Sequence, residues 1–320
     1  MDHLILLMGR IADFAGKDLS RKQKAAARAQ QLKAQSPTNT MSYPSQPSLP
    51  GFAMPADTHY NPAFGLQNPT QDLELETCTT IALNEWLSIS HALDIFEESL
   101  GPSFAALSPE HMTPLSTPFG PAIYYRTYGI ACIWTLYYTG RIISTRVHPS
   151  MPPAAMVAAG MAAPRTAAWA NIIGRINAGI QPISTTIPLN PAHGAALMDA
   201  CMGTFHAGVQ YQDAAQRGWT IKQLRDIARL TGWQTSALIA SGCERAWQKA
   251  YENGRGPKYE RTMNAEAKDD RVAGRSREAE RGPPKDNNDR RFIKVNPGTR
   301  VYWAMGILSA EEDMAALSIG

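Results

Sequence analysis

The sequence predicts an all-α fold in which several helices pack against one another. Apolar residues recur at helical spacing along most of the chain, and no stretch alternates polar and apolar residues over any length. Alanine and glycine are frequent in these segments, so helix backbones can approach closely. With 320 residues, 44% of them hydrophobic, the chain has enough apolar material for a sizeable core.

Composition divides the chain into five segments. Residues 1–35 predict one helix with an apolar first half and a basic second half, and we interpret the basic half as a solvated extension rather than an import signal. Residues 36–71 are rich in Pro, Ser, Asn and Gln, which predicts a disordered insert. Residues 72–254 predict the helical body, residues 255–291 a charged flexible excursion, and residues 292–320 a segment that docks back on the body.

Local signals predict where some of the helices end. Asn190, followed by proline, has the pattern of an N-cap. Thr220 and Gln223 have the spacing of a capping box, which predicts that a helix begins at Thr220. The last long helix is expected to end at Asn253, before Gly254.

The first helix of the predicted body follows the insert. Its apolar residues Leu83, Trp86, Leu87 and Leu93 fall on one side at helical spacing, so we expect that side to face the core.

The most apolar stretch, Pro121–Gly140, is interpreted as a helix buried in protein and not as a membrane span. Arg126 lies within it and would cost roughly 2.5–3.5 kcal/mol near the centre of a bilayer. Aromatic residues from this stretch are candidates for lining a ligand pocket, although an aromatic core is their more common use. They are Tyr124, Tyr125, Trp134, Tyr137 and Tyr138.

The sequence contains no motif for catalysis, cofactor binding or metal binding. It has no Gly-rich phosphate loop, no H-E-x-x-H and no G-x-S-x-G. Its four cysteines form no C-x-x-C pair, so buried free thiols are expected in place of disulfides or a zinc site. Cys201 and His206 lie five positions apart on one predicted helix and should point away from each other. We therefore expect no enzymatic activity and no cofactor or metal in this chain.

The stretch Thr220–Gly242 has the spacing of a helix-turn-helix DNA reader. Ala228, Gly232 and Leu238 stand where that motif has a small residue, a turn glycine and a buried apolar residue. The net charge of +3 is only mildly basic, which is weak evidence against a nucleic-acid module.

In this alternative, DNA would be contacted by Lys222, Arg225 and Gln234. A glutamine can read adenine, but no Arg or Lys closely follows Gln234, where phosphate contacts are needed. Trp219 and Trp233 flank the first helix, and large aromatic residues at such positions usually fill a core. We therefore prefer the interpretation that the two helices are packed into a larger body.

Four blocks of the sequence carry a family resemblance: MDHLILLMGRIADFAGKD, YYTGRIISTRVHPSMPPAAMVAAGMAAP, FHAGVQYQDAAQRGWTIKQLRDIARLTGWQTSALIASGCERAW and NPGTRVYWAMGILSAEED. Together they resemble the regulatory region of the fungal-specific binuclear zinc-cluster transcription factors. The resemblance implies an all-helical region that lies C-terminal to a DNA-binding module in a nuclear regulator of transcription. It implies the transcription machinery or regulatory proteins as partners, and a homodimer as an assembly.

The sequence departs from that family because the six cysteines of the zinc cluster are missing. Zinc is therefore expected only in the missing module, and DNA contact only indirectly or through that module. Either the chain is a truncated form that begins downstream of the cluster, or it is a relative without one. The expected location is the nucleus, or the cytoplasm if an import signal is missing. Regulation through protein contacts or a small ligand is the leading hypothesis, with a helix-turn-helix protein or a helical metabolite-binding protein as alternatives.

Overall fold

A computed structural model describes residues 2–35, 69–181 and 189–260 of the chain. These residues form seven α-helices, one 3₁₀ turn and one pair of two-residue antiparallel strands, so the all-α prediction is confirmed for them. The elements are α1 (Asp2–Gln35), α2 (Pro69–Ser99), η1 (Pro102–Phe104), β1 (Ser116–Thr117), β2 (Gly120–Pro121), α3 (Tyr128–Arg146), α4 (Ala155–Ile180), α5 (Pro191–Gly208), α6 (Ala214–Thr231) and α7 (Thr235–Glu252). The predicted insert up to residue 68, and the predicted segments after residue 260, lie outside the described residues.

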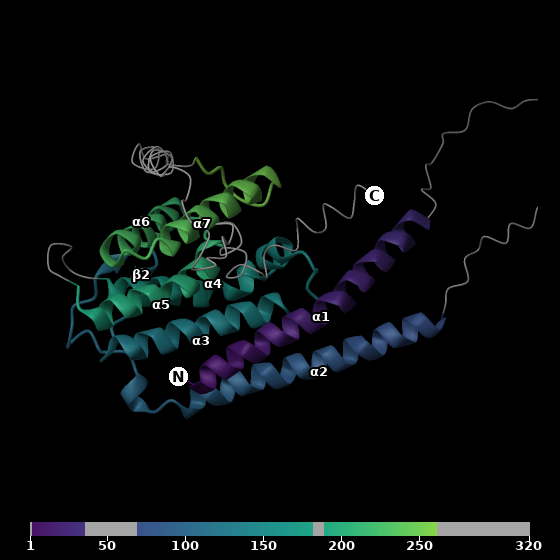
Figure 1. Cartoon of the computed structure of the whole chain (residues 1–320), viewed down its shortest axis with the longest axis horizontal. Coiled ribbons are helices and arrows are strands. Elements are labelled where there is room, and N and C mark those ends of the chain that lie inside the picture. The colour runs from purple at the N-terminus through teal and green to yellow at the C-terminus, as the bar shows by residue number, and fades with distance from the viewer. Residues whose placement is uncertain (1, 36–68, 182–188, 261–320) are drawn as a thin grey trace, which may run out of the picture.

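The helices form three layers around α3 (Figure 1). The long helices α1 and α2 lie side by side and both contact α3. Helices α4 and α5 pack against α3 and against each other, and α6 and α7 cover α5. The helix predicted over residues 1–35 is therefore part of the main body. Within the described ranges, no helix combines the length and apolar character that a membrane span requires.

Helix α3 separates two parts of the apolar core. Leu4, Ile11 and Leu93 from α1 and α2 surround Tyr137 of α3 on one side. On its other side, α3 contributes Cys132 to a larger cluster that extends through α4 and α5 to α6 and α7. Both faces of α3 are therefore buried.

A close approach in this core joins α3 and α5. Gly203 of α5 lies against α3, where an added Cβ would stand 2.5 Å from Thr135 Cγ2 and 2.9 Å from Thr139 Oγ1. Distances this short between carbon and its neighbours are strongly repulsive, so only glycine fits at position 203 without moving one helix.

The polypeptide before α3 is extended and not helical, so the helix predicted over Pro121–Gly140 begins too early. The N–H of Ile123 donates to the carbonyl of Arg175 on α4 (3.0 Å), which ties this stretch to a neighbouring helix. Helix α3 begins only after Thr127, whose hydroxyl accepts from the N–H of Ile130 (3.3 Å). A local N-cap and a tertiary hydrogen bond therefore decide the start of α3.

The start predicted at Thr220 is also wrong. Helix α6 begins six residues earlier, where the carboxylate of Asp213 accepts from the N–H of Gln216 (2.9 Å). Thr220 lies inside the helix, is buried, and donates its hydroxyl to the carbonyl of Gln216 (2.8 Å). By contrast, the predicted ends at Asn190 and Asn253 are confirmed as an N-cap and a C-cap.

The contact at Gly203 gives a stability prediction with a matched control. Gly203→Ala should lower the free energy of unfolding by about 1–3 kcal/mol, because the methyl group overpacks the α3–α5 contact. At Gly218 in α6 an added Cβ meets nothing within 4 Å. Gly218→Ala should therefore raise the free energy of unfolding by up to about 1 kcal/mol, through helix propensity alone. Urea denaturation of the two variants checks this, and equal shifts would contradict the close approach.

Candidate functional site

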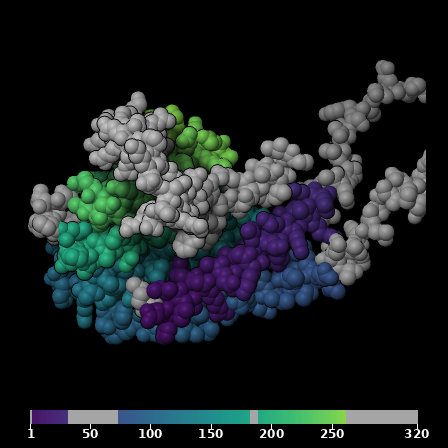
Figure 2. Space-filling view, in the orientation of Figure 1, coloured from purple at the N-terminus to yellow at the C-terminus, as the bar shows by residue number. Residues whose placement is uncertain are grey.

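A pocket of about 290 Å³ lies where α1 meets the end of α3, the start of α4 and the end of α5. We call it the junction pocket. Lys22, Arg146 and His206 bring nitrogen atoms to it. The rest of its wall is apolar and is formed by Ala12, Ala15, Gly16, Leu19, Ile143, Val147, Pro152, Pro153, Ala155 and Ala158. Figure 2 shows α1, which supplies one wall, lying along the body beside α2.

The guanidinium of Arg146 is buried at the end of α3. Its Nη2 donates to the carbonyl oxygen of His206 (2.6 Å) and to Oε1 of Gln210 (3.3 Å), and its Nη1 lies 3.3 Å from Nδ1 of His206. Its Nε has no hydrogen-bond partner. Burial lowers the pKa of Arg146 to about 10, so the group is still a cation at neutral pH. Among the described residues, no carboxylate forms an ion pair with it.

Lys22 brings a second buried ammonium group to the pocket. Its Nζ donates to the carbonyl of Val147 (2.9 Å) and lies 3.6 Å from Oδ2 of Asp18. Asp18 is shared with Arg21, whose Nε and Nη2 donate to it at 2.5 and 3.0 Å. Burial lowers the pKa of Lys22, against the smaller opposing effect of Asp18. One carboxylate therefore serves two cations on α1.

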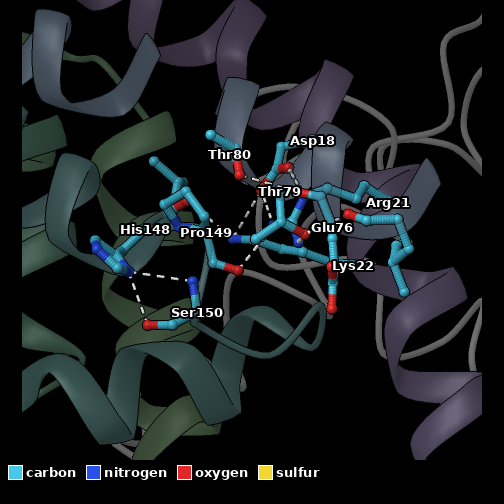
Figure 3. Close-up of polar contacts among 11 residues, drawn as sticks. Asp18, Arg21, Lys22, Glu76, Thr79, Thr80, His148, Pro149 and Ser150 are labelled. Atoms are coloured by element: carbon cyan, nitrogen blue, oxygen red, sulfur yellow. Dashed lines mark hydrogen bonds and ion pairs between the residues drawn. The ribbon is translucent and has the colours of Figure 1, made fainter. Parts of the chain in front are cut away.

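Arg21 and Lys22 also attach α1 to the turn that follows α3. Figure 3 shows both side chains pointing from α1 toward this turn, which carries His148, Pro149 and Ser150. Arg21 Nη2 donates to the carbonyl of Pro149 (2.8 Å), and Arg21 Nη1 donates to the hydroxyl of Thr79 on α2 (3.0 Å). The turn is held between α1 and α2 by these bonds.

His206 is a neutral acceptor in this arrangement. Burial and the positive charge of Arg146 lower its pKa to about 3, so the ring is uncharged at neutral pH. Because guanidinium has only donors, Nδ1 of His206 accepts from Arg146. Cys201 Sγ donates instead to the carbonyl of Leu197 (3.3 Å), so Cys201 and His206 have separate partners, as expected from their spacing.

Four of the five aromatic residues predicted to line a pocket pack together around the ring of Trp134. The ring of Trp134 lies 6.5 Å from that of Tyr125 and 5.7 Å from those of Tyr137 and Tyr138. Tyr124 is half-buried beside Gly179 of α4. None of the five lines the junction pocket or a second pocket between α4 and α7. A ligand role for them stays a prediction, while the geometry supports a core role.

The three residues of the DNA-binding alternative are exposed or half-exposed, and two of them have acidic partners. Lys222 Nζ lies 2.7 Å from Asp226 on the same helix, and Arg225 Nη2 lies 3.5 Å from the buried Glu244 of α7. Gln234 is exposed at the start of α7, and its side chain makes no cap bond. Intramolecular partners therefore hold the two cations that this alternative assigns to phosphate.

The tryptophans that flank α6 pack into the body. Trp219 stands edge-on to Phe119 with ring centroids 5.2 Å apart, and Trp233 packs against the core that α5, α6 and α7 share. Gly232 makes the turn with φ 72°, as a helix-turn-helix would require. Leu238, however, is 42% exposed, where that motif buries an apolar residue. The geometry favours packed helices over a DNA reader.

Three of the four cysteines are buried free thiols, as predicted, whereas the prediction is wrong for Cys78 on α2, which is exposed. Burial raises the pKa of Cys132 to about 12 and that of Cys201 to about 11, and it raises that of Cys243 as well. Such thiols stay protonated and unreactive in the folded protein. The described part of the chain gathers no group of three His, Cys, Asp or Glu side chains that would hold a metal ion.

Comparisons with protein-family models, with curated proteins and with solved structures found no match to this chain. The site is therefore defined by its own geometry.

Sequence reasoning did not find the junction pocket, because its cations are far apart along the chain. In the sequence, His206 stands out only by its spacing from Cys201, and Arg146 lies six residues beyond the predicted helix Pro121–Gly140. The usable signal was Arg146 itself, an arginine shortly after the apolar stretch Pro121–Gly140 with no acidic residue nearby in the sequence.

The buried neutral His206 predicts a loss of stability in acid. The unfolded side chain binds a proton below its ordinary pKa of 6.5, whereas the folded one resists protonation down to about 3. Stability present above pH 6.5 is therefore lost as the pH falls toward 3, by up to about 1.4 kcal/mol per pH unit. His206→Asn keeps an acceptor for Arg146. Between pH 6 and 4.5, its free energy of unfolding, measured by urea denaturation, should fall less steeply with decreasing pH than that of the parent. Above pH 7 the free energies of unfolding of parent and variant should depend on pH in the same way. Equal pH dependence below pH 6 would contradict the burial of a neutral His206 ring.

Proposed function

We propose that this chain is the helical regulatory region of a fungal zinc-cluster type transcription factor, and that it acts through contacts with other regulatory proteins. The proposal rests on the four-block sequence resemblance together with one structural observation, the exposed apolar outer face of α2. The helix-turn-helix alternative is less well supported, because the helices concerned are packed into the body.

Helix α2 has apolar residues on two opposite sides. Ile89 and Leu93 face the core, and Trp86 Nε1 donates to the carbonyl of Ser144 on α3 (2.8 Å). Five other large apolar side chains are 38–65% exposed: Leu73, Ile81, Leu83, Leu87 and Ile95. At about 3.6 residues per turn they fall on one side of α2, opposite Ile89 and Leu93. The expectation that Leu83 and Leu87 share the core-facing side with Trp86 is wrong.

An exposed apolar stripe of this length is typical of a protein-binding surface. We call these five residues the α2 outer face. Exposed carboxylates lie along it, at Glu76 and Glu98. The partner that fits is a protein that presents an apolar helix flanked by Lys or Arg, since opposite charges at the rim favour association.

The test fuses the chain to a DNA-binding domain of known target sequence and measures a reporter gene. The fusion should change reporter output several-fold relative to the DNA-binding domain alone. The double variant Ile81→Gln/Leu87→Gln should remove that effect while the free energy of unfolding stays within about 0.5 kcal/mol, because both side chains are exposed. Met161→Gln/Leu238→Gln, at exposed apolar positions of α4 and α7 away from α2, is the matched control and should keep the effect.

Two results would overturn the proposal. The first is a reporter measurement in which the folded fusion has no effect, or in which the double variant has the same effect as the parent fusion. The other is duplex DNA binding by the unfused chain that weakens steeply with salt and is reduced by Lys222→Ala and Arg225→Ala, which would restore the DNA-binding alternative.

A further inference from the structure

The junction pocket holds more buried positive charge than its carboxylates neutralise. Lys22 and Arg146 both line it and are 8% and 5% exposed. Lys22 shares Asp18 with Arg21, and among the described residues Arg146 has no ion pair. The carbonyl of His206 near the end of α5 balances part of the charge on Arg146. Burying cations without full compensation is costly, and a bound anion would offset that cost.

We propose that the junction pocket binds a small organic acid, with its carboxylate at Arg146 and Lys22 and its apolar body against the alanines and prolines of the wall. This inference goes beyond the proposed function, because it adds a small-molecule ligand to a chain proposed to act through protein contacts. The binding itself depends only on the pocket.

The donors that remain are suited to one carboxylate. Of the five N–H groups of Arg146, three donate to His206 and Gln210, so Nε and one N–H of Nη1 are left. Lys22 has three N–H groups, of which one donates to Val147 and another faces Asp18. A phosphate dianion carries more oxygen acceptors and a second charge, which these few donors would not satisfy.

The size and wall of the pocket point to a ligand with a short apolar body. Its volume of about 290 Å³ is at the lower end of the range for small-molecule sites. Ten of its thirteen lining residues are Ala, Gly, Leu, Ile, Val or Pro. Gly16 on α1 lines the pocket at an exposed position, where an added Cβ would meet nothing within 4 Å, so a larger side chain can be placed there.

The experiment measures binding of hexanoate and of benzoate to the purified chain by calorimetry and by the shift in melting temperature. Hexanamide, inorganic phosphate and chloride at equal ionic strength are the comparison probes. We expect one of the two acids to bind and to raise the melting temperature, whereas hexanamide, phosphate and chloride do not. Stabilisation by phosphate alone, or by hexanamide as strongly as by hexanoate, would overturn the assignment of an organic acid. So would the absence of acid binding at concentrations on the order of 10 mM.

Two pairs of variants locate the site. Lys22→Met removes a pocket cation and should weaken acid binding at least tenfold, whereas Lys24→Met removes an exposed cation from the same helix and should not. Gly16→Leu fills the pocket and leaves both cations in place, so it should abolish binding. Gly9→Leu makes the same change at another open position of α1 outside the pocket and should leave binding intact. Equal binding by Gly16→Leu and Gly9→Leu would place the ligand elsewhere and refute the proposal.

The binding and reporter measurements fail independently. Binding to the junction pocket without any effect of the fused chain on the reporter would leave the ligand class standing and remove the regulatory function. A reporter effect that needs the α2 outer face, without acid binding to the purified chain, would leave the regulatory function standing and remove the ligand class.

Discussion

The rest of the structure depends on the packing of α3, whose two faces are both covered. Small residues on both sides make this packing close. An added Cβ at Gly140 of α3 would stand 3.1 Å from Met8 Sδ and 3.6 Å from Leu93 Cδ2, and Gly203 of α5 leaves no room for a Cβ against α3. Because α1 and α2 cover one side of α3 and α5 the other, the Arg146 side chain at the end of α3 is only 5% exposed. The burial of Arg146 is a consequence of this arrangement.

The α1–α2 pair is attached to the body by polar bonds to the chain at the end of α3. Lys22 and Arg21 donate to the carbonyls of Val147 and Pro149, and Trp86 Nε1 donates to that of Ser144. Each bond satisfies a backbone acceptor that the end of a helix or a turn leaves without a partner. The same lysine that completes this attachment also faces the junction pocket. The attachment of α1 and the charge of the pocket therefore have one structural origin.

The sequence predicted the helices well because helical periodicity is a local property, and the caps at Asn190 and Asn253 could be read from neighbouring residues. It predicted the starts of α3 and α6 poorly because longer-range or competing groups decide them. The hydrogen bond from Ile123 to Arg175 joins the chain before α3 to α4. Asp213 caps α6 seven residues before Thr220, so Thr220 lies inside the helix. The two-residue strands are too short to show any alternation.

The candidate site could not be predicted, since it combines positions 22, 146 and 206, which only the packing of three helices brings together. The α2 outer face was missed for a different reason. A helix with apolar residues on both sides has a weak amphipathic pattern, so Leu83 and Leu87 could not be told from residues that face the core.

The junction pocket and the α2 outer face belong to the same helix pair. Arg10 of α1 forms an ion pair with Glu85 of α2 (2.8 Å) and donates to the hydroxyl of Ser88 (3.0 Å), which joins the two helices along their length. A ligand bound between α1 and α3 stabilises the arrangement in which α1 is docked on the body. The size of this effect is set by how much more tightly the ligand binds that arrangement than any other. A partner on α2 that prefers the docked pair would then bind more tightly when the pocket is filled, and by linkage the ligand would bind more tightly in the presence of the partner. The helix pair is therefore the part of this fold in which binding of a small acid and binding of a protein can be coupled without any change in the α3–α5 core.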